Sequence, residues 1–298
     1  MKFFDLHCDT LAEIYAKKES LLSNTCNISL DLTNNFEKYT QVLAVWSNPK
    51  RTDDELYDNF FGTLSHFKST SFPLPDNFSY ILAVEGGNLI GHDLSRIDRL
   101  FESGVRIFTP VWSDVTQIGG AFNTDAGLTE LGKDAVKRCL ELGILPDVSH
   151  SSDKGFFDIA ELSESFGKPF IASHSNSRAV CNHMRNLTDE MAKVIINTRG
   201  LIGISMFSFH ISEKENPAID DIYRHVEHYL SIGCEDVLSF GGDLDGTNDV
   251  MPEGVRRIND FEKICDYLSK KLPESTVNKI MFENANSFFE RNGIIPQK

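Results

Sequence analysis

Histidine and acidic residues stand directly after several apolar segments of this chain, and both residue types bind divalent cations. The first case is the stretch FFDLHCDT, in which His7 and Asp9 are two residues apart. Side chains of a strand alternate between its faces, so His7 and Asp9 point the same way and Cys8 points the opposite way. An imidazole and a carboxylate on one face can bind one metal ion together. His-x-Asp is a common pattern, however, and this pair alone does not predict a site.

Four further apolar segments end in the same residue types. They are YILAVEGG with Glu85, ILPDVSH with His150, PFIASH with His174, and VLSFGGDLDG with Asp243 and Asp245. Each has an ordinary interpretation of its own. A single histidine after a strand is usually a hydrogen-bonding residue, the glycines of VEGG can relieve backbone strain, and GGDLDG can form an Asx turn.

The elements that must position these residues are eight apolar, β-branched segments. They predict strands at Lys2–His7, Gln41–Trp46, Tyr80–Val84, Val105–Trp112, Ile144–Val148, Pro169–Ser173, Leu201–Phe207 and Val237–Gly241. Amphipathic stretches between them, such as LTELGKDAVKRCLELG, end at a glycine that suits a helix C-terminus. Eight strands with intervening helices predict a (β/α)8 TIM-type barrel rather than a doubly wound sheet. No repeat or linker divides the chain, so we expect one domain over residues 1–298.

In a parallel barrel, the carboxyl ends of all strands meet at one mouth. Five of the predicted strands are followed by His, Asp or Glu at this one mouth. This is better explained by a single metal site with donors His7, Asp9, Glu85, His150 and His174 than by five unrelated residues. This set of nitrogen and oxygen ligands suits Zn²⁺, with Mn²⁺, Co²⁺ or Fe²⁺ as alternatives. If the site holds two ions, the carboxylate between them is most naturally Glu85.

Composition excludes several classes of function. The formal net charge of −15 argues against binding to nucleic acid or to anionic membrane surfaces. The chain has no uncharged apolar run of about 18 residues, and no basic segment with an apolar run opens it. Its six cysteines are scattered without C-x-x-C pairs. We therefore expect a cytoplasmic protein with reduced thiols and no membrane contact.

These strings also resemble the membrane dipeptidase (renal dipeptidase) family of dinuclear zinc hydrolases, which have amidohydrolase-type barrels. The likeness runs from DLHCDT through AVEGG, GLTELGKDAVKRCLELGILPDVSHSS and IASHSNSRAVCNHMRNLTDE to GGDLDG. KIMFENANSFF is similar to the C-terminal helix of the family. The resemblance implies hydrolysis of free dipeptides by a metal-bridged hydroxide, with D-residues tolerated at the C-terminal position. Because family members often form dimers, it also suggests a homodimer.

The resemblance further implies a role for each site residue. It assigns one zinc ion to His7 and Asp9, the other to His150 and His174, and the bridge between them to Glu85. Asp243, the first acid of GGDLDG, matches the general acid/base of the family. Arg185, in HMRN, matches the residue that binds the carboxylate of the substrate.

Trp112 departs from the family pattern, because peptidases of the family often carry a histidine there that contacts the scissile carbonyl. An indole N–H donates one hydrogen bond but cannot exchange a proton near pH 7. His210 can supply an imidazole from another side, or it is an ordinary loop residue. The departure leaves one alternative open, a metal-dependent hydrolase of another small amide, lactone or phosphoester. A separate alternative is a catalytically silent protein that binds metal and a small ligand or peptide, but the presence of all five ligand residues and Asp243 argues against it.

His225 and His228 form a weaker signal. They are three residues apart in IDDIYRHVEHYLSIG, a spacing that places two imidazoles on one side of a helix. We expect them to belong to a solvated face beside Asp221 rather than to a second metal site.

Overall fold

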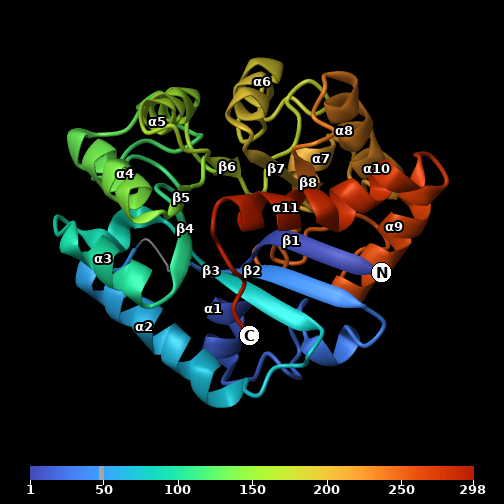
Figure 1. Ribbon diagram of the computed structural model, residues 1–298, viewed down its shortest axis with the longest axis horizontal. Coiled ribbons are helices and arrows are strands. Elements are labelled where there is room, and N and C mark those ends of the chain that lie inside the picture. The colour runs from blue at the N-terminus through green and yellow to red at the C-terminus, as the bar shows by residue number, and fades with distance from the viewer. Residues whose placement is uncertain (47–49) are drawn as a thin grey trace.

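The strands form a single parallel barrel (Figure 1). The computed structural model describes residues 1–46 and 50–298, and its strands are hydrogen-bonded in the order β5-β4-β3-β2-β1-β8-β7-β6. A bridge between Asp147 and Ile171 joins the two ends of this order. The predicted (β/α)8 fold is therefore confirmed. The strands are β1 (Lys2–Cys8), β2 (Lys38–Trp46), β3 (Phe78–Glu85), β4 (Val105–Thr109), β5 (Leu145–Pro146), β6 (Ile171–Ala172), β7 (Leu201–Ile204) and β8 (Leu238–Phe240).

Helices surround the barrel (Figure 1). They are α1 (Thr10–Lys17), α2 (Asp53–Thr70), α3 (Ser95–Glu102), α4 (Glu130–Leu142), α5 (Asp153–Ser165), α6 (Asp189–Thr198), α7 (Ser208–Ile211), α8 (Ile219–Ser231), α9 (Phe261–Ser269), α10 (Glu274–Asn278) and α11 (Asn284–Arg291). The hydroxyls of Thr129, Ser152 and Thr188 each accept a backbone hydrogen bond three residues later. These N-caps fix where α4, α5 and α6 begin, and so where the loops before them end.

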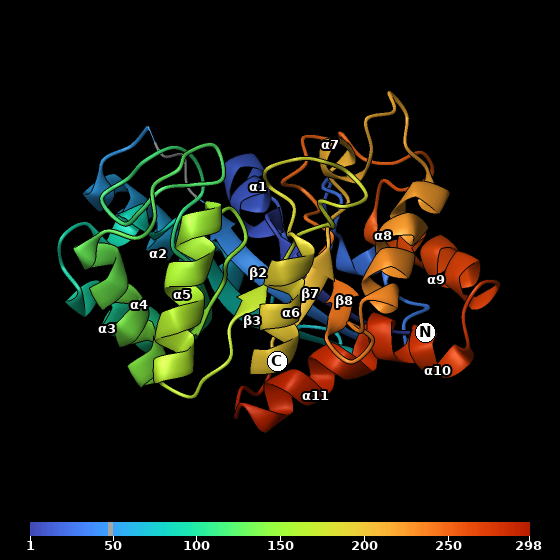
Figure 2. The ribbon, with the colours of Figure 1, turned by 90° about the horizontal axis from the view of Figure 1, so that it is seen from above.

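The two ends of the barrel differ in chemistry. Inward-facing apolar side chains, among them Phe4, Val42 and Ile81, fill the interior together with residues of α11. The ring of Phe289 in α11 stacks on that of Phe4 with 5.1 Å between centroids. Figure 2 shows α11 across one end of the barrel, with α1, α7 and long loops at the other. The apolar plug at the amino ends of the strands leaves the carboxyl ends open for polar groups.

Several strands are shorter than predicted, because their final backbone groups bond to side chains or lack a donor. The predicted strands ended at Trp112, Ser173 and Phe207. β4 ends before Pro110, which has no N–H for a ladder. β6 ends before Ser173, whose N–H donates to Asp147. β7 ends before Ser205, whose N–H donates to Asn176.

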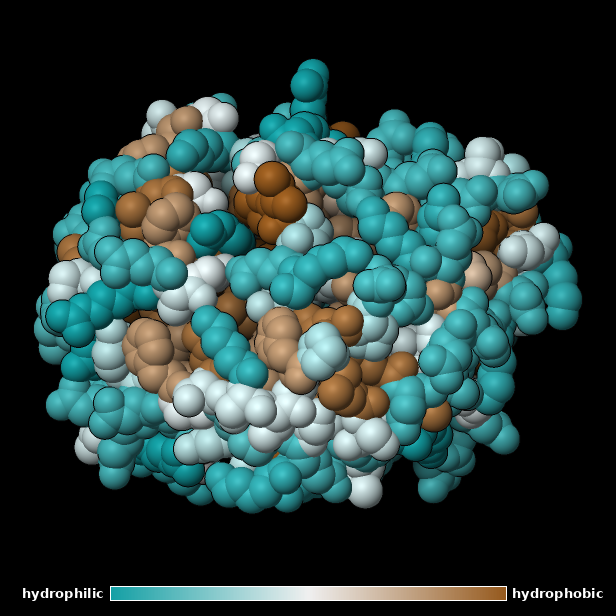
Figure 3. Space-filling view, turned by 60° about the horizontal axis from the view of Figure 1, so that its bottom comes forward, coloured by the Kyte–Doolittle hydropathy of each residue, from teal (hydrophilic) through white to brown (hydrophobic). Residues whose placement is uncertain are grey.

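The exterior is polar. On the face in Figure 3, hydrophilic residues predominate and apolar residues form only small patches, in line with the net charge of −15. Within the described ranges, we find no helix whose length and hydropathy would let it cross a lipid bilayer. All six cysteines are unpaired, and only Cys265 is not buried.

Candidate metal centre

The predicted donors converge on the carboxylate of Glu85, which is 3% exposed at the end of β3. Its Oε1 lies 2.9 Å from Nε2 of His150 and 3.5 Å from Nε2 of both His7 and His174. Nε2 of His7 is also 3.9 Å from Oδ2 of Asp9. The structure thus brings together side chains from β1, β3 and the ends of β5 and β6, as the barrel topology predicted.

These donors form two groups that share Glu85. One contains His7 and Asp9, the other contains His150 and His174, and the ligand atoms of each group lie within 4.8 Å of one another. Two ligands about 2.0–2.1 Å from one tetrahedral zinc ion lie about 3.3 Å apart, close to the separations around Glu85. Nε2 of His7 and Oδ1 of Asp9 are also buried without a hydrogen-bond partner. Unpaired buried polar atoms are costly, so the residues fit divalent cations.

The electrostatics of the cluster suit cation binding. Burial raises the pKa of Glu85, but His7 and His150 outweigh it and hold that pKa well below its ordinary value. Burial lowers the pKa of His7, but the charges of Glu85 and Asp9 raise it well above its ordinary value. Burial lowers the pKa of His150 to about 4 and also lowers that of His174. A cation entering the site would therefore find two neutral imidazoles and replace the proton on His7.

Asp243 and Asp245, both from GGDLDG, have different surroundings. Oδ1 of Asp243 lies 3.8 Å from Nε2 of His7, and burial raises the pKa of Asp243 well above its ordinary value. The carboxylate of Asp245 instead accepts hydrogen bonds from the hydroxyl of Thr10 and the N–H of Asn27. Asp243 therefore belongs to the cluster, whereas Asp245 holds the segment after α1 in place.

Unusual backbone conformations allow this close packing. His150 and Asp243 have φ values of 70° and 56°, in the left-handed region that non-glycine residues rarely adopt. A Cβ at Gly246 would collide with the carboxylates of both Asp9 and Asp243. Backbone strain of this kind persists where the surrounding structure imposes it, and functional sites are a common place for it.

Arg185 lies beside the cluster in the loop between β6 and α6, and its side chain is buried. Its Nη1 donates to Oγ of Ser175 at 2.8 Å, while Nε and Nη2 are buried and have no hydrogen-bond partner among the residues that the structure describes. Its charge contributes, after burial, to the lowered pKa of His150. A buried guanidinium with two unused donors is complementary to a carboxylate, which can accept two parallel hydrogen bonds.

Trp112 and His210 lie on different sides of the cluster. The ring of Trp112, after β4, is 5.2 Å from that of Trp46 and 6.1 Å from that of His150. His210, in α7, is buried with its ring 4.7 Å from that of His183. Burial lowers the pKa of His210, and the neighbouring charge of Arg185 lowers it further. His210 therefore lies on the Arg185 side of the site as a neutral imidazole.

Asp147 is a site residue that the sequence analysis missed. Its Oδ1 accepts from the N–H groups of Ser149 and Ser173, at 3.0 and 2.9 Å. Its Oδ2 accepts from the hydroxyls of Thr109 and Ser173, at 2.8 and 2.6 Å. A carboxylate oxygen of Asp147 lies near two metal-site histidines, but these four bonds occupy the acceptor sites of the group. Asp147 thus connects β4, β5 and β6 and is not placed as a ligand.

The link from Asp147 to His174 passes through Ser173. The carboxylate can only accept, so the hydroxyl of Ser173 donates to Asp147 and must accept from Nδ1–H of His174, 2.7 Å away. This bond selects the tautomer of His174 whose Nε2 carries a lone pair, and that nitrogen lies 2.9 Å from Nε2 of His150 and 3.5 Å from Oε1 of Glu85. The signal in the sequence was the serine that precedes the histidine in both DVSH and IASH.

Replacing Asp147 by Asn should weaken metal binding about 10- to 100-fold, because Ser173 would lose the acceptor that orients it toward His174. Chelator competition measures the affinity, and ¹⁵N NMR of labelled histidine reports the tautomer of His174. Thr109→Val is the matched control, since it removes one bond to Asp147 without touching Ser173. Unchanged metal affinity in a folded Asp147→Asn protein would contradict this role.

His225 is not on a solvated face, so that expectation was wrong. It is fully buried, accepts a hydrogen bond at Nδ1 from the N–H of Ser177 at 3.0 Å, and donates from Nε2 to the carbonyl of Ile211 at 2.8 Å. The face of α8 that carries it packs on the loop after β6 and on α7. His228 instead bonds to Asp189 near the surface.

Acid should destabilise this contact. Burial lowers the pKa of His225 from 6.5 to about 4, so between these values the unfolded chain binds a proton that the folded protein does not. The contribution of His225 to the free energy of unfolding is therefore complete above pH 6.5 and lost as pH falls toward 4. Relative to His225→Gln, which can make both bonds without titrating, the metal-free wild type should lose about 2 kcal/mol between pH 7 and 5. Urea unfolding of both proteins at pH 7 and pH 5 measures the free energy of unfolding. Equal losses in the wild type and in His225→Gln would contradict this prediction.

Comparison with known proteins identifies the same family that the sequence motifs resemble. The family model for membrane dipeptidase (peptidase family M19) matches residues 68–291, more than half of the chain. His7 and Asp9 precede that matched segment.

Similar proteins include two uncharacterized relatives and one solved structure. An uncharacterized protein from the PQQ-III 3′ region of Acinetobacter calcoaceticus is 33% identical over 162 residues, 50% of each chain. An uncharacterized dipeptidase from Schizosaccharomyces pombe is 26% identical over 267 residues, 87% of this chain and 63% of that protein. The chain thus spans half the length of the first relative and less than two thirds of the length of the second. A metallopeptidase from Rhodobacter sphaeroides, solved with a phosphinate mimic of the dipeptide L-Ala-D-Ala, has the same fold, with a TM-score of 0.84, 23% identity, and coverage of 98% and 99%.

Proposed function

Because this chain belongs to the membrane dipeptidase family, we propose that it is a metal-dependent dipeptidase that hydrolyses free dipeptides, including those with a C-terminal D-residue. The observation that carries this proposal is the buried guanidinium of Arg185, with two unused donors beside a cluster of metal-binding groups. The dipeptide mimic bound by the Rhodobacter sphaeroides protein supports a substrate of that size.

The metals that we propose are two Zn²⁺ ions, with Mn²⁺, Co²⁺ or Fe²⁺ as alternatives. His7 and Asp9 would hold one ion, His150 and His174 the other, and Glu85 both. Bound there, divalent cations would supply Lewis-acid activation of water and of the scissile carbonyl.

Asp243 is the group that we propose moves protons. It accepts one from the attacking water and delivers it to the amine nitrogen that leaves. Its burial favours the protonated form, which raises its pKa and suits a residue that must hold a proton between the two transfers. Its carboxylate lies close to His7, on the side of the cluster formed by β1 and β8.

Arg185 is the group that we propose binds the substrate carboxylate. Nε and Nη2 would each donate one hydrogen bond to it, while Nη1 remains on Ser175. The neutral ring of His210 lies on the same side and can add a donor. A carboxylate held here next to the reacting centre favours a substrate with one residue after the scissile bond, which is a dipeptide rather than a polymer.

Asp243→Asn should retain both metals but lower kcat by about 10²- to 10⁴-fold, because an amide cannot accept the proton. Metal analysis of the purified variant and steady-state kinetics with Ala-Ala measure the two properties. Asp245→Asn, a change two residues away in a group that bonds to Thr10 and Asn27, serves as the matched control. Full turnover by Asp243→Asn would remove this residue from the reaction.

Arg185→Lys should raise KM for free dipeptides by about 30-fold or more, because a lysine cannot donate two parallel hydrogen bonds. The same substitution should change KM much less for dipeptides with an amidated C-terminus, which offer no carboxylate. Equal effects on both substrates would argue against binding of the substrate carboxylate by Arg185. Assays of N-acyl amino acids, lactones and phosphoesters with the same metals test the alternative hydrolase activities.

A further inference from the structure

A second substrate contact follows from the position of Arg185 in the barrel. Arg185 follows β6, and β2 is four strands away in either direction around the eight-stranded order. If the carboxylate of a dipeptide binds Arg185 and its peptide bond lies at Glu85, the N-terminal residue must extend beyond the cluster, away from β6. This direction leads toward the ends of β1 and β2, where a polar pocket of about 490 Å³ borders Asp9 and Trp46.

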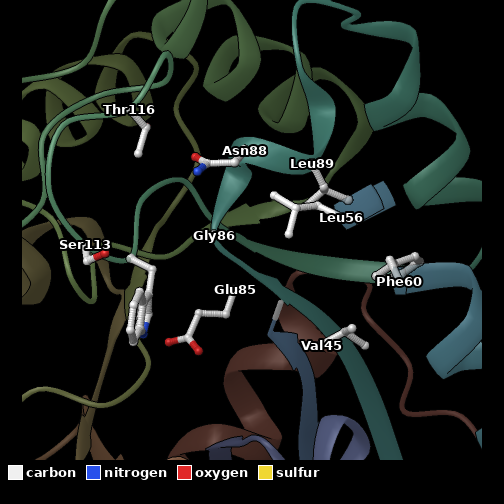
Figure 4. Close-up of a pocket in the computed structure, with 10 residues that line it drawn as sticks. Val45, Leu56, Phe60, Glu85, Gly86, Asn88, Leu89, Ser113 and Thr116 are labelled. Carbon is white, nitrogen blue, oxygen red and sulfur yellow. The ribbon is translucent and has the colours of Figure 1, made fainter. Parts of the chain in front are cut away.

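Two hollows border the cluster on that side, and their sizes differ greatly. The crevice behind Glu85 holds only about 20 Å³, about enough for one water. Figure 4 shows the apolar side chains of Leu56, Phe60 and Leu89 on one side of this crevice, with the carboxylate of Glu85 pointing away from them. The other hollow holds about 490 Å³ and is lined by both Asp9 and Trp112. Only the second can accept a side chain.

Three aromatic rings stand among the mostly polar residues that line this larger pocket. Trp46, at the end of β2, and Trp112 pack edge to face, with 5.2 Å and 61° between their rings. Tyr15 of α1 adds a third ring to the lining. The indole Nε1 of Trp46 is buried and has no hydrogen-bond partner within residues 1–46 and 50–298. The charged side chains of the lining are those of Asp9, Glu13, Asp245, Lys18 and Arg51.

We propose that this pocket binds the side chain of the N-terminal residue, and that the enzyme therefore prefers dipeptides with a large aromatic residue at that position. This inference rests on the proposed dipeptidase function. A volume of about 490 Å³ far exceeds the needs of an alanine methyl group and lies within the range of small-molecule sites. Ring faces and edges of Trp46 and Trp112 offer the geometry that aromatic side chains favour. Trp112, which departs from the family pattern, is thereby a specificity-determining residue.

Kinetics with matched substrates test the preference. We expect kcat/KM for Phe-Ala to exceed that for Ala-Ala by about 10- to 100-fold, the effect of burying one aromatic side chain. Ala-Phe has the same composition as Phe-Ala in reversed order, and it should lack most of this advantage. Trp46→Ala should lower the ratio of Phe-Ala to Ala-Ala. Phe166→Ala, a partly exposed ring at the far end of α5, should leave that ratio unchanged.

Fluorescence offers a test that does not depend on turnover. The chain has two tryptophans, and both line the pocket, so indole emission reports changes at its wall. In the zinc-loaded Asp243→Asn protein, Phe-Ala should change this emission and bind about 10-fold or more tightly than Ala-Ala. Trp46→Phe and Trp112→Phe variants assign the signal to each ring.

The outcomes separate this inference from the function on which it rests. Equal kcat/KM values, or equal affinities, for Phe-Ala and Ala-Ala would overturn the pocket assignment while leaving the dipeptidase activity in place. Selective binding of Phe-Ala without hydrolysis by the zinc-loaded wild type would overturn the proposed function and support the pocket. If the wild type hydrolyses Phe-Ala in preference to Ala-Ala and Trp46→Ala loses that preference, both the pocket assignment and the dipeptidase function are supported.

Discussion

Burial of one carboxylate among imidazoles is the constraint around which this molecule is organised. Glu85 is removed from water at the centre of the barrel mouth, where an isolated anion would be very costly. Three histidines from different strands compensate for it, and their own burial keeps two of them neutral. The buried negative charge of the cluster is compensated only when protons or metal cations are bound. Every strand that contributes a side chain to the cluster must also end at the same height along the barrel axis. The parallel barrel meets that requirement because its strands all run in one direction.

The same constraint accounts for the weakest part of the barrel. β5 and β6 contain two residues each and meet at a single bridge, beside the two histidines that they position. Here side chains replace backbone pairing, since Asp147 bonds to groups at or just after the ends of three neighbouring strands. Ser149 and Ser175 extend these contacts toward Arg185 through a chain of hydroxyls. The predicted metal ligand His174 and Arg185, the residue that we propose binds the substrate carboxylate, therefore share one hydrogen-bond network.

The shape of the site also bears on the length of the substrate. Arg185 on one side of the Glu85 cluster, and the pocket with Trp46 and Trp112 on the other, fit the dipeptide that we propose as substrate, with one residue on each side of the scissile bond. The two buried, unpaired N–H groups of Arg185 favour a terminal carboxylate, which an internal peptide segment does not have. The volume at Trp46 and Trp112 is the basis of the selectivity that we propose for the amino-terminal residue. Peptidases of the family often carry a histidine at this position, whereas Trp112 lines the pocket that we propose for the substrate side chain.

The sequence by itself determined the number and order of the strands, because apolar periodicity and the polar residues after each strand are local properties. It also predicted that His7, Asp9, Glu85, His150 and His174 would meet, since parallel strands bring their carboxyl ends together. Only the tertiary structure decided what depends on neighbours far along the chain. Whether an acid such as Asp147 binds a metal or connects neighbouring strands by hydrogen bonds depends on donors near the ends of three strands. In the same way, the burial of a histidine on a helix depends on which loops pack against that helix. Side-chain surroundings are set by packing between distant segments, which local sequence patterns do not encode.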